Sequence, residues 1–328
     1  MSIPNHIVHT LTQYLPLAQP SHIEIIQPLW NDYGYCVRCR LRSGRYVVVK
    51  VVALPTTLTH HPKGWTTKRS HARKCRSFEV EMNFYQHYAL HTPLPQLPKP
   101  FTLKTLENGW LFALSDLKAE GFINTCTQIT VAQSFGVLDW LAHFHGSFLH
   151  HSGEGLWPQG GYWHLSTRQD ELKQTQSDPL KSAAGKLDEL LATCPYQTII
   201  HGDAKVANFC FTADFQQCAA VDFQYPGRAP GIVDVAYFIG SALTDKDQVV
   251  YWETCLDRYF STLAQALSAN FDEHQIKQIE SAWRALYPIA CADFHRFLSG
   301  WSPEHWKINQ HLHEQTAFAL AMLDQNQF

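Results

Sequence analysis

The sequence predicts an α+β fold in which an antiparallel sheet carrying one helix is followed by a larger, mainly helical part. Roughly the first third of the 328 residues contains runs of β-branched and aromatic residues separated by hairpin signals. After Asp116 the apolar residues recur instead at three- and four-residue spacing, which is typical of helices. We therefore expect two lobes, residues 1–116 and 117–328, joined by a short hinge rather than by a flexible linker.

The expected sheet is formed by strands that come before and after its helix in the chain. Three strands are predicted between residues 23 and 53, and the last two are joined by a turn at Ser43-Gly44. Residues 71–90 show helical spacing, and a cluster of four prolines then ends the helix. A second hairpin, with Asn108-Gly109 at its turn, completes this part of the chain.

The second part is expected to be helical around a short functional loop. Helices are predicted over residues 130–150 and 179–192 and from residue 232 to the end, with a Gly- and Trp-rich loop at 152–170. Two short apolar runs flank residues 201–211 and are interpreted as small strands on either side of this loop.

Bulk composition argues against several classes of partner and location. The formal net charge of −3 leaves no basic excess for nucleic acid. No stretch approaches 18 consecutive apolar residues, so we expect no membrane span. The first 20 residues contain no Lys or Arg and do not resemble a secretory signal. Nine scattered cysteines do not suggest a disulfide framework, and we expect a cytoplasmic location.

The strongest functional signal is the loop HGDAKVAN at residues 201–208, followed by VDF at 221–223. Phosphoryl transfer from ATP needs a group that orients the proton of the nucleophile, oxygen ligands for Mg²⁺, and a cation that offsets phosphate charge. Asp203 can orient the proton of the nucleophile, and Asn208 can supply one oxygen ligand for Mg²⁺. Asp222 can complete the metal site. The alternative is that these are ordinary turn residues, but several positions agree at fixed offsets.

These residues resemble the signature of the aminoglycoside phosphotransferase and choline kinase superfamily, including its ecdysteroid kinase-like branch. The resemblance implies a bilobal protein-kinase-like fold. It also implies that Asp203 is the catalytic base, that Asn208 and Asp222 are magnesium ligands, and that His201 supports the loop. Lys205 corresponds to the lysine that protein kinases place on the transferred phosphate, although many small-molecule kinases lack it.

The first part of the chain contains candidates for nucleotide binding. Lys50 has apolar neighbours on its strand and needs a partner if it is buried, and Glu81 on the following helix is the expected one. This resembles the kinase lysine–glutamate pair that faces the α- and β-phosphates; the alternative is an edge-strand lysine turned to solvent. Gly34 departs from the GxGxxG pattern, and either lets a hairpin approach the phosphates or simply forms a turn.

Two further segments are assigned by resemblance. Residues 111–117 resemble the hinge that hydrogen-bonds the adenine edge, and Ser115 and Leu117 are its candidates for ATP binding; an ordinary strand end is the alternative. Asp234 resembles the family's aspartate that braces the catalytic loop through backbone N–H groups, which is a supporting role.

The phosphate acceptor is expected between the catalytic loop and the C-terminal helices. Residues 283–306 combine aromatic rings with a carboxylate, which suits an amine through cation–π attraction. The alternative is that these rings form a helix-packing core. The candidate acceptor-binding residues are Trp283, Tyr287, Asp293 and Trp301, with Arg168 from the preceding loop.

Together these residues predict a small-molecule kinase that uses ATP and Mg²⁺. The acceptor is a hydroxyl compound such as a choline-like amino alcohol, an aminoglycoside or a hydrophobic alcohol. The alternative is a catalytically silent pseudokinase that binds nucleotide as a binding module. Protein-kinase activity is less expected, because the chain between Asp222 and Asp234 leaves little room for a peptide-docking segment. The sequence leaves the oligomeric state open.

Overall fold

The chain forms two compact units. The computed structural model describes residues 3–18, 23–29, 33–55, 68–90 and 94–325. The first unit comprises Met1–Thr92 and Leu97–Ile123, and the second comprises Pro93–Gln96 and Asn124–Phe328. An antiparallel sheet lies in the first unit and most of the helices lie in the second, so the predicted α+β class is confirmed.

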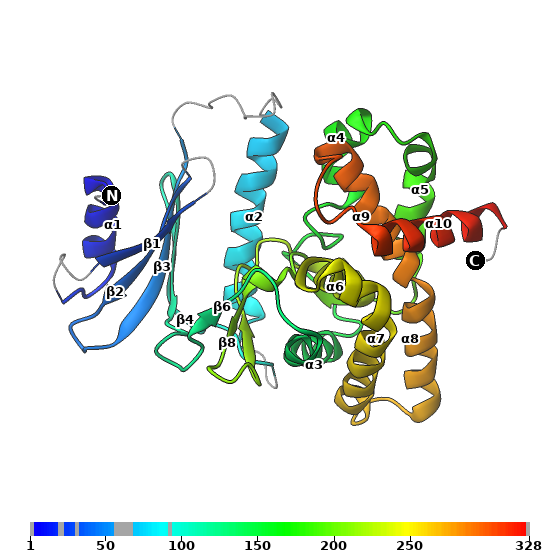
Figure 1. The fold of residues 1–328 in the computed structure, drawn as a ribbon. Helices are drawn as coiled ribbons and strands as arrows, with labels where there is room; N and C mark the ends of the chain where they lie inside the picture. The colour runs from blue at the N-terminus through cyan, green and yellow to red at the C-terminus, as the bar shows by residue number, and fades with distance from the viewer. Residues whose placement is uncertain (1–2, 19–22, 30–32, 56–67, 91–93, 326–328) are drawn as a thin grey trace. The chain divides into compact units, whose positions relative to one another are not determined.

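The first unit is built on a five-stranded antiparallel sheet with the order β1-β2-β3-β5-β4. Within this unit, α1 (Asn5–Tyr14) lies on one side of the sheet and α2 (Lys68–His87) on the other (Figure 1). The strands are β1 (Ile23–Pro28), β2 (Gly34–Arg40), β3 (Tyr46–Ala53), β4 (Pro100–Leu106) and β5 (Gly109–Ser115).

Strand β3 separates the core of this unit from its polar face. Val47, Val49 and Val51 alternate along the strand and are buried together with Ile7 and Leu11 of α1. The side chain at position 50 points to the opposite face, towards α2. The sequence analysis did not predict α1, although its two buried residues stand four apart, as one helix face requires.

The second unit packs eight helices and five short strands within the described residues. The helices are α3 (Val131–Ser147), α4 (Gln169–Gln174), α5 (Asp178–Thr193), α6 (Ile232–Ala242), α7 (Asp245–Leu267), α8 (Glu273–Ala285), α9 (Tyr287–Trp301) and α10 (Gln310–Asp324). Helix α3 begins with a capping box between Thr130 and Gln133. Helix α9 is buried along nearly its whole length, and α4, α5, α6 and α10 pack against it.

The short strands position the predicted catalytic loop. Strand β7 (Thr198–Ile200) pairs with β10 (Gly227–Ala229) and ends immediately before His201. The short 3₁₀ helix η4 (Val206–Asn208) then leads into β8 (Phe209–Phe211). Strand β8 pairs with β6 (Asn124–Thr125) and β9 (Cys218–Ala220), so the chain returns to the same place just before Asp222.

Membrane-spanning helices are absent from the described ranges: none of the helices there combines the length and the apolar character that a crossing needs.

Candidate functional site

Asp234, in the first turn of α6, holds the start of the loop. Its Oδ2 accepts a hydrogen bond from the backbone N–H of His201 at 2.6 Å, and its Oδ1 accepts one from that of Gly202 at 2.9 Å. The carboxylate has no solvent exposure. Charge-assisted bonds of this kind are stronger than neutral ones, so Asp234 fixes the backbone just before Asp203.

His145 and Tyr259 orient this carboxylate. His145 Nε2 lies 3.2 Å from Asp234 Oδ2, and His145 Nδ1 lies 2.8 Å from Tyr259 Oη. Burial and the charge of Asp234 raise the pKa of Tyr259 well above its usual value, so the phenol stays protonated. The phenol therefore donates to Nδ1, and Nε2 carries the proton that points at Asp234. Sequence reasoning missed His145 and Tyr259, because their partners lie 89 and 114 residues away along the chain.

His201 ties the two halves of the predicted motif together. Its Nδ1 accepts a hydrogen bond from the backbone N–H of Asp203 at 3.2 Å, and its Nε2 donates to the carbonyl of Val221 at 3.0 Å. A carbonyl can only accept, so the proton sits on Nε2 and the imidazole is neutral. The ring therefore links the loop that carries Asp203 to the segment that carries Asp222.

The three polar side chains of the loop form one cluster. Asp203 Oδ2 accepts from Lys205 Nζ at 3.0 Å and from Asn208 Nδ2 at 3.1 Å. Burial opposes the charge on Lys205, but the carboxylates of Asp203 and Asp222 outweigh this effect and raise its pKa, so the lysine is a cation. The other oxygen of Asp203, Oδ1, is buried and has no hydrogen-bond partner among the described residues. A buried carboxylate oxygen needs a donor, and a substrate hydroxyl would be one.

Asn208 and Asp222 stand together at one end of the β8–β9 hairpin. The Val221 N–H donates to the Asn208 carbonyl at 2.9 Å. Asn208 Nδ2 is used by Asp203, so its Oδ1 is the atom that a metal would bind. Asp222 adopts a left-handed φ of 69°, which is uncommon outside glycine and is seen at functional sites.

These two residues fit Mg²⁺, because an amide oxygen and a carboxylate are the hard ligands it prefers. Within the described ranges, no three His, Cys, Asp or Glu side chains come together as a self-sufficient metal site. Proteins usually bind Mg²⁺ through one or two side chains, while phosphates and water supply the remaining ligands.

In the first unit, Lys50 and Glu81 form a buried ion pair. Lys50 Nζ lies 3.0 Å from Glu81 Oε1 and 2.7 Å from Oε2, with the two side chains 12% and 3% exposed. The nearby Glu79 pairs instead with Arg76 on the exposed face of α2. The alternative interpretation, an edge-strand lysine turned to solvent, is therefore wrong.

The remaining nucleotide candidates have structural roles of their own. Gly34 has a φ of +125°, and a Cβ there would lie 2.0 Å from the Val51 carbonyl oxygen, so strand pairing alone requires glycine. Residues 30–32 of the expected hairpin lie outside the described residues. Ser115 closes the β4–β5 edge: its hydroxyl accepts from the Lys99 N–H at 3.1 Å. Leu117 is buried in the same unit.

The candidates for acceptor binding lie mostly within the helix packing. Trp283 is fully buried, and its Nε1 donates to the carbonyl of Tyr196 at 2.9 Å. Tyr287 is buried too and hydrogen-bonds His311. Both aromatic side chains therefore belong to the core of the second unit.

The charged candidates are paired inside the same unit. Asp293 forms a buried ion pair with Arg296 at 2.8 Å, and Arg168 forms one with Glu171 at 2.9 Å. Trp301, at the end of α9, is partly exposed and stacks on a neighbouring phenylalanine. Both ion pairs join residues three positions apart in the chain, and Arg296 also donates a hydrogen bond to the carbonyl of Trp163 at 3.0 Å.

Two tyrosines lie beside Asp203 instead. Burial and the Asp203 carboxylate raise the pKa of Tyr162, and burial, Tyr162 and Asp203 raise that of Tyr237. Their ring centroids are 5.6 Å apart. The sequence analysis missed Tyr237, because a tyrosine in an apolar helical run gives no signal of its own.

Two comparisons with known proteins return kinase-like relatives. Residues 164–270, which contain the whole loop and Asp234, match the model of the Ecdysteroid kinase-like family. An ethanolamine kinase from Plasmodium vivax has a similar structure, with a TM-score of 0.55 and 8% sequence identity over 98% of this chain and 88% of that one. The fold is protein-kinase-like. The predicted resemblance to the ecdysteroid kinase-like branch is therefore confirmed.

The chain is also similar to the structure of aminoglycoside phosphotransferase APH(3'')-Id from Streptomyces rimosus. It gives a TM-score of 0.48 at 12% identity, over 87% of this chain and 99% of that one. No curated protein sequence matches the chain.

Proposed function

We propose that the chain is a small-molecule kinase that transfers the γ-phosphoryl group of ATP to a hydroxyl. The observation that carries the proposal is the buried, unpartnered Oδ1 of Asp203, set in a cluster with Lys205 and Asn208. A turn that served only to join two strands would not need a buried carboxylate oxygen without a donor. The match to the Ecdysteroid kinase-like family over residues 164–270 supports the same reaction class.

In the proposed reaction, Asp203 orients the acceptor hydroxyl. The acceptor oxygen bonds to the γ-phosphorus, and the bond to the bridging oxygen breaks with its electron pair leaving on ADP. The hydroxyl proton passes to Asp203 late in the step. Lys205, held at 3.0 Å from Asp203, offsets charge on the transferred group. Mg²⁺, held by Asn208 and Asp222, would neutralise charge on the phosphate oxygens.

The first unit supplies the proposed nucleotide contacts. Lys50, fixed by Glu81, is proposed to bind the α- and β-phosphates. Gly34 would approach the phosphates, and Ser115 and Leu117 would lie beside the adenine. On this proposal the nucleotide-binding lobe is 1–116, and 117–328 carry the reacting groups and the acceptor.

The proposal is tested by acceptor-dependent formation of ADP from Mg·ATP across a panel of hydroxyl compounds. The variant Asp203→Asn keeps the shape of the side chain but removes the base, so we expect kcat to fall by about 10²–10⁴ with the Kd for ATP nearly unchanged. Asp324→Asn, an exposed aspartate at the end of α10, is the matched control and is expected to keep wild-type turnover.

Two outcomes would contradict the proposal. Near-normal turnover in Asp203→Asn would remove this residue from the role of base. Tight ATP binding by the wild-type protein, without ADP formation for any acceptor in the panel, would favour the pseudokinase alternative.

A further inference from the structure

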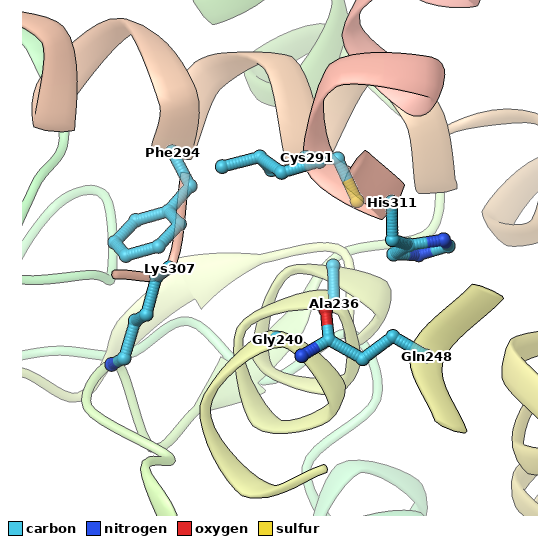
Figure 2. A pocket seen from close by; sticks show the side chains of 8 residues that line it. Ala236, Gly240, Gln248, Cys291, Phe294, Lys307 and His311 are labelled. Atoms are coloured by element: carbon cyan, nitrogen blue, oxygen red, sulfur yellow. The ribbon is translucent and has the colours of Figure 1, made fainter. Parts of the chain in front are cut away.

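Lys307, in the connection between α9 and α10, is a buried cation that the sequence analysis did not single out. Its side chain is 9% exposed. Its stem and Phe294 line a cavity of about 10 Å³, which is room for a single water molecule. Figure 2 shows the ammonium group pointing away from Cys291 and His311 on the other side of this cavity.

The ammonium group sits on aromatic rings. Lys307 Nζ lies 4.5 Å from the ring centroid of Tyr237, 5.6 Å from that of Trp306 and 5.8 Å from that of Phe294. It also donates a hydrogen bond to Tyr237 Oη at 3.3 Å. These are the contacts by which an aromatic cage binds a cationic ligand, and here the protein's own lysine makes them.

This cation has no acidic counterpart of its own. Lys307 forms no ion pair with any residue that the structure describes, although buried charges in proteins are normally paired. The nearest functional carboxylate, Asp203, is already paired with Lys205 at 3.0 Å. Lys307 therefore has no ion-pair partner of its own among the described residues.

Lys307 is also close to Asp203 and to Tyr237, one of the two tyrosines beside Asp203. Tyr237, its hydrogen-bond partner, has its pKa raised in part by Asp203. Asp203 and Lys205 in turn act on the pKa of Lys307, the first raising it and the second lowering it, so the three groups are close enough to sense each other. A molecule that donates its hydroxyl to Asp203 Oδ1 would meet this cation.

We propose that Lys307 is the acceptor-recognition residue of this site, and that the acceptor is a hydroxy compound carrying an anionic group, a carboxylate or a phosphate. The proposal rests on the proposed kinase function and specifies its substrate class. An amino alcohol would bring a second cation to rings that already hold one, and like charges close together in a buried site repel. An anion would instead complete the pairing that the chain leaves open.

The wild-type protein provides the first test, with acceptors matched in length. Hydroxy carboxylates and glycerol phosphate are compared with the corresponding hydroxy amides and with amino alcohols, by ADP formation from Mg·ATP. We expect kcat/KM for the anionic acceptors to exceed that for the amides by about tenfold or more, and amino alcohols to be the poorest. Because carboxylates and phosphates are separate arms, the assay also identifies which anion is preferred.

Variants at position 307 assign the preference to this residue. Lys307→Met keeps the apolar stem, and should raise KM for anionic acceptors about 10- to 100-fold with kcat within about threefold, while KM for the amides stays unchanged. Lys307→Arg restores the charge and should recover part of the loss. Lys246→Met, an exposed lysine of α7, is the control and should behave as wild type.

The possible failures are distinguishable. If amino alcohols or neutral alcohols are the best acceptors, or if Lys307→Met changes KM equally for charged and neutral acceptors, the inference is wrong and the kinase function stands. If no acceptor supports ADP formation by wild type, both are wrong. Should Lys307→Met fail to fold, the wild-type comparison and Lys307→Arg still decide the matter.

Discussion

Two buried lysines of this chain differ in how their charge is balanced. Lys50 in the first unit is 12% exposed and lies 2.7 Å from the carboxylate of Glu81. Lys307 in the second unit is 9% exposed and forms no ion pair within the described part of the chain, but rests on aromatic rings. An internal counter-ion fixes where a cation points before any ligand arrives, whereas an uncompensated cation gains most when a ligand brings the missing charge. Both lysines are proposed to bind a ligand, so they differ in whether the protein itself already supplies the counter-charge.

The largest expected effect comes from breaking the paired charge. Lys50→Met removes the ammonium group that lies 2.7 Å from the buried Glu81 carboxylate. We therefore expect the first unit to lose about 3–5 kcal/mol of stability, measured by urea denaturation. The double variant Lys50→Met/Glu81→Leu should recover most of this loss, because it removes both charges. Equal destabilisation in the single and double variants would show that packing, rather than pairing, dominates this site.

The next largest effect is the pH dependence of kcat/KM for anionic acceptors. Burial lowers the pKa of Lys307 to about 8, so the group is a cation below that pH and loses its charge above it. We therefore expect kcat/KM for an anionic acceptor to be constant below about pH 8 and to fall about tenfold per pH unit above it, while neutral acceptors show no such fall.

The control for this profile is Lys307→Arg, whose charge persists across the range and which should remove the fall. A profile that is the same in wild type and Lys307→Arg would contradict the assignment. Of the neighbouring groups, burial lowers the pKa of His311 to about 4, while the pKa values of Lys205 and Tyr237 are raised. The titratable and charged groups that surround Lys307 are Asp203, Lys205, Tyr162, Tyr237, His305 and His311.

The smallest effect is on the stability of the second unit. Lys307→Met removes a buried cation that has no counter-ion, so we expect a change within about 1 kcal/mol, in the stabilising direction. The same urea measurement as for Lys50→Met makes the two variants directly comparable. A loss as large as that of Lys50→Met would mean that Lys307 has an internal counter-charge, and the contrast between the two lysines would disappear.

The sequence predicted those parts of the molecule whose signal is local. Runs of β-branched residues predicted the strands around Lys50. Polar residues at fixed, short spacing predicted the loop at 201–208. The chain's resemblance to the ecdysteroid kinase-like branch was predicted from the same loop. The roles of the individual site residues stay predictions.

What the sequence did not predict depends on distant pairing. His145 and Lys307 belong to no sequence motif, and their roles depend on partners that only the fold brings close. The aromatic residues of 283–306 show the converse: composition alone did not decide between a ligand cage and helix packing, and Trp283 and Tyr287 are fully buried. A high content of aromatic residues predicts that much surface is buried, but not whether that surface contacts a ligand or a neighbouring helix.

The position of Lys307 bears on how this scaffold diversifies. Helix α9 is enclosed on nearly all sides, so substitutions along it disturb the interior, whereas residues 302–309 form a short connection outside any helix. Connections of this kind tolerate replacement and insertion better than the elements they join. If the proposed role of Lys307 holds, a lineage that exchanged this one segment would alter which alcohols it modifies while leaving α9 in place.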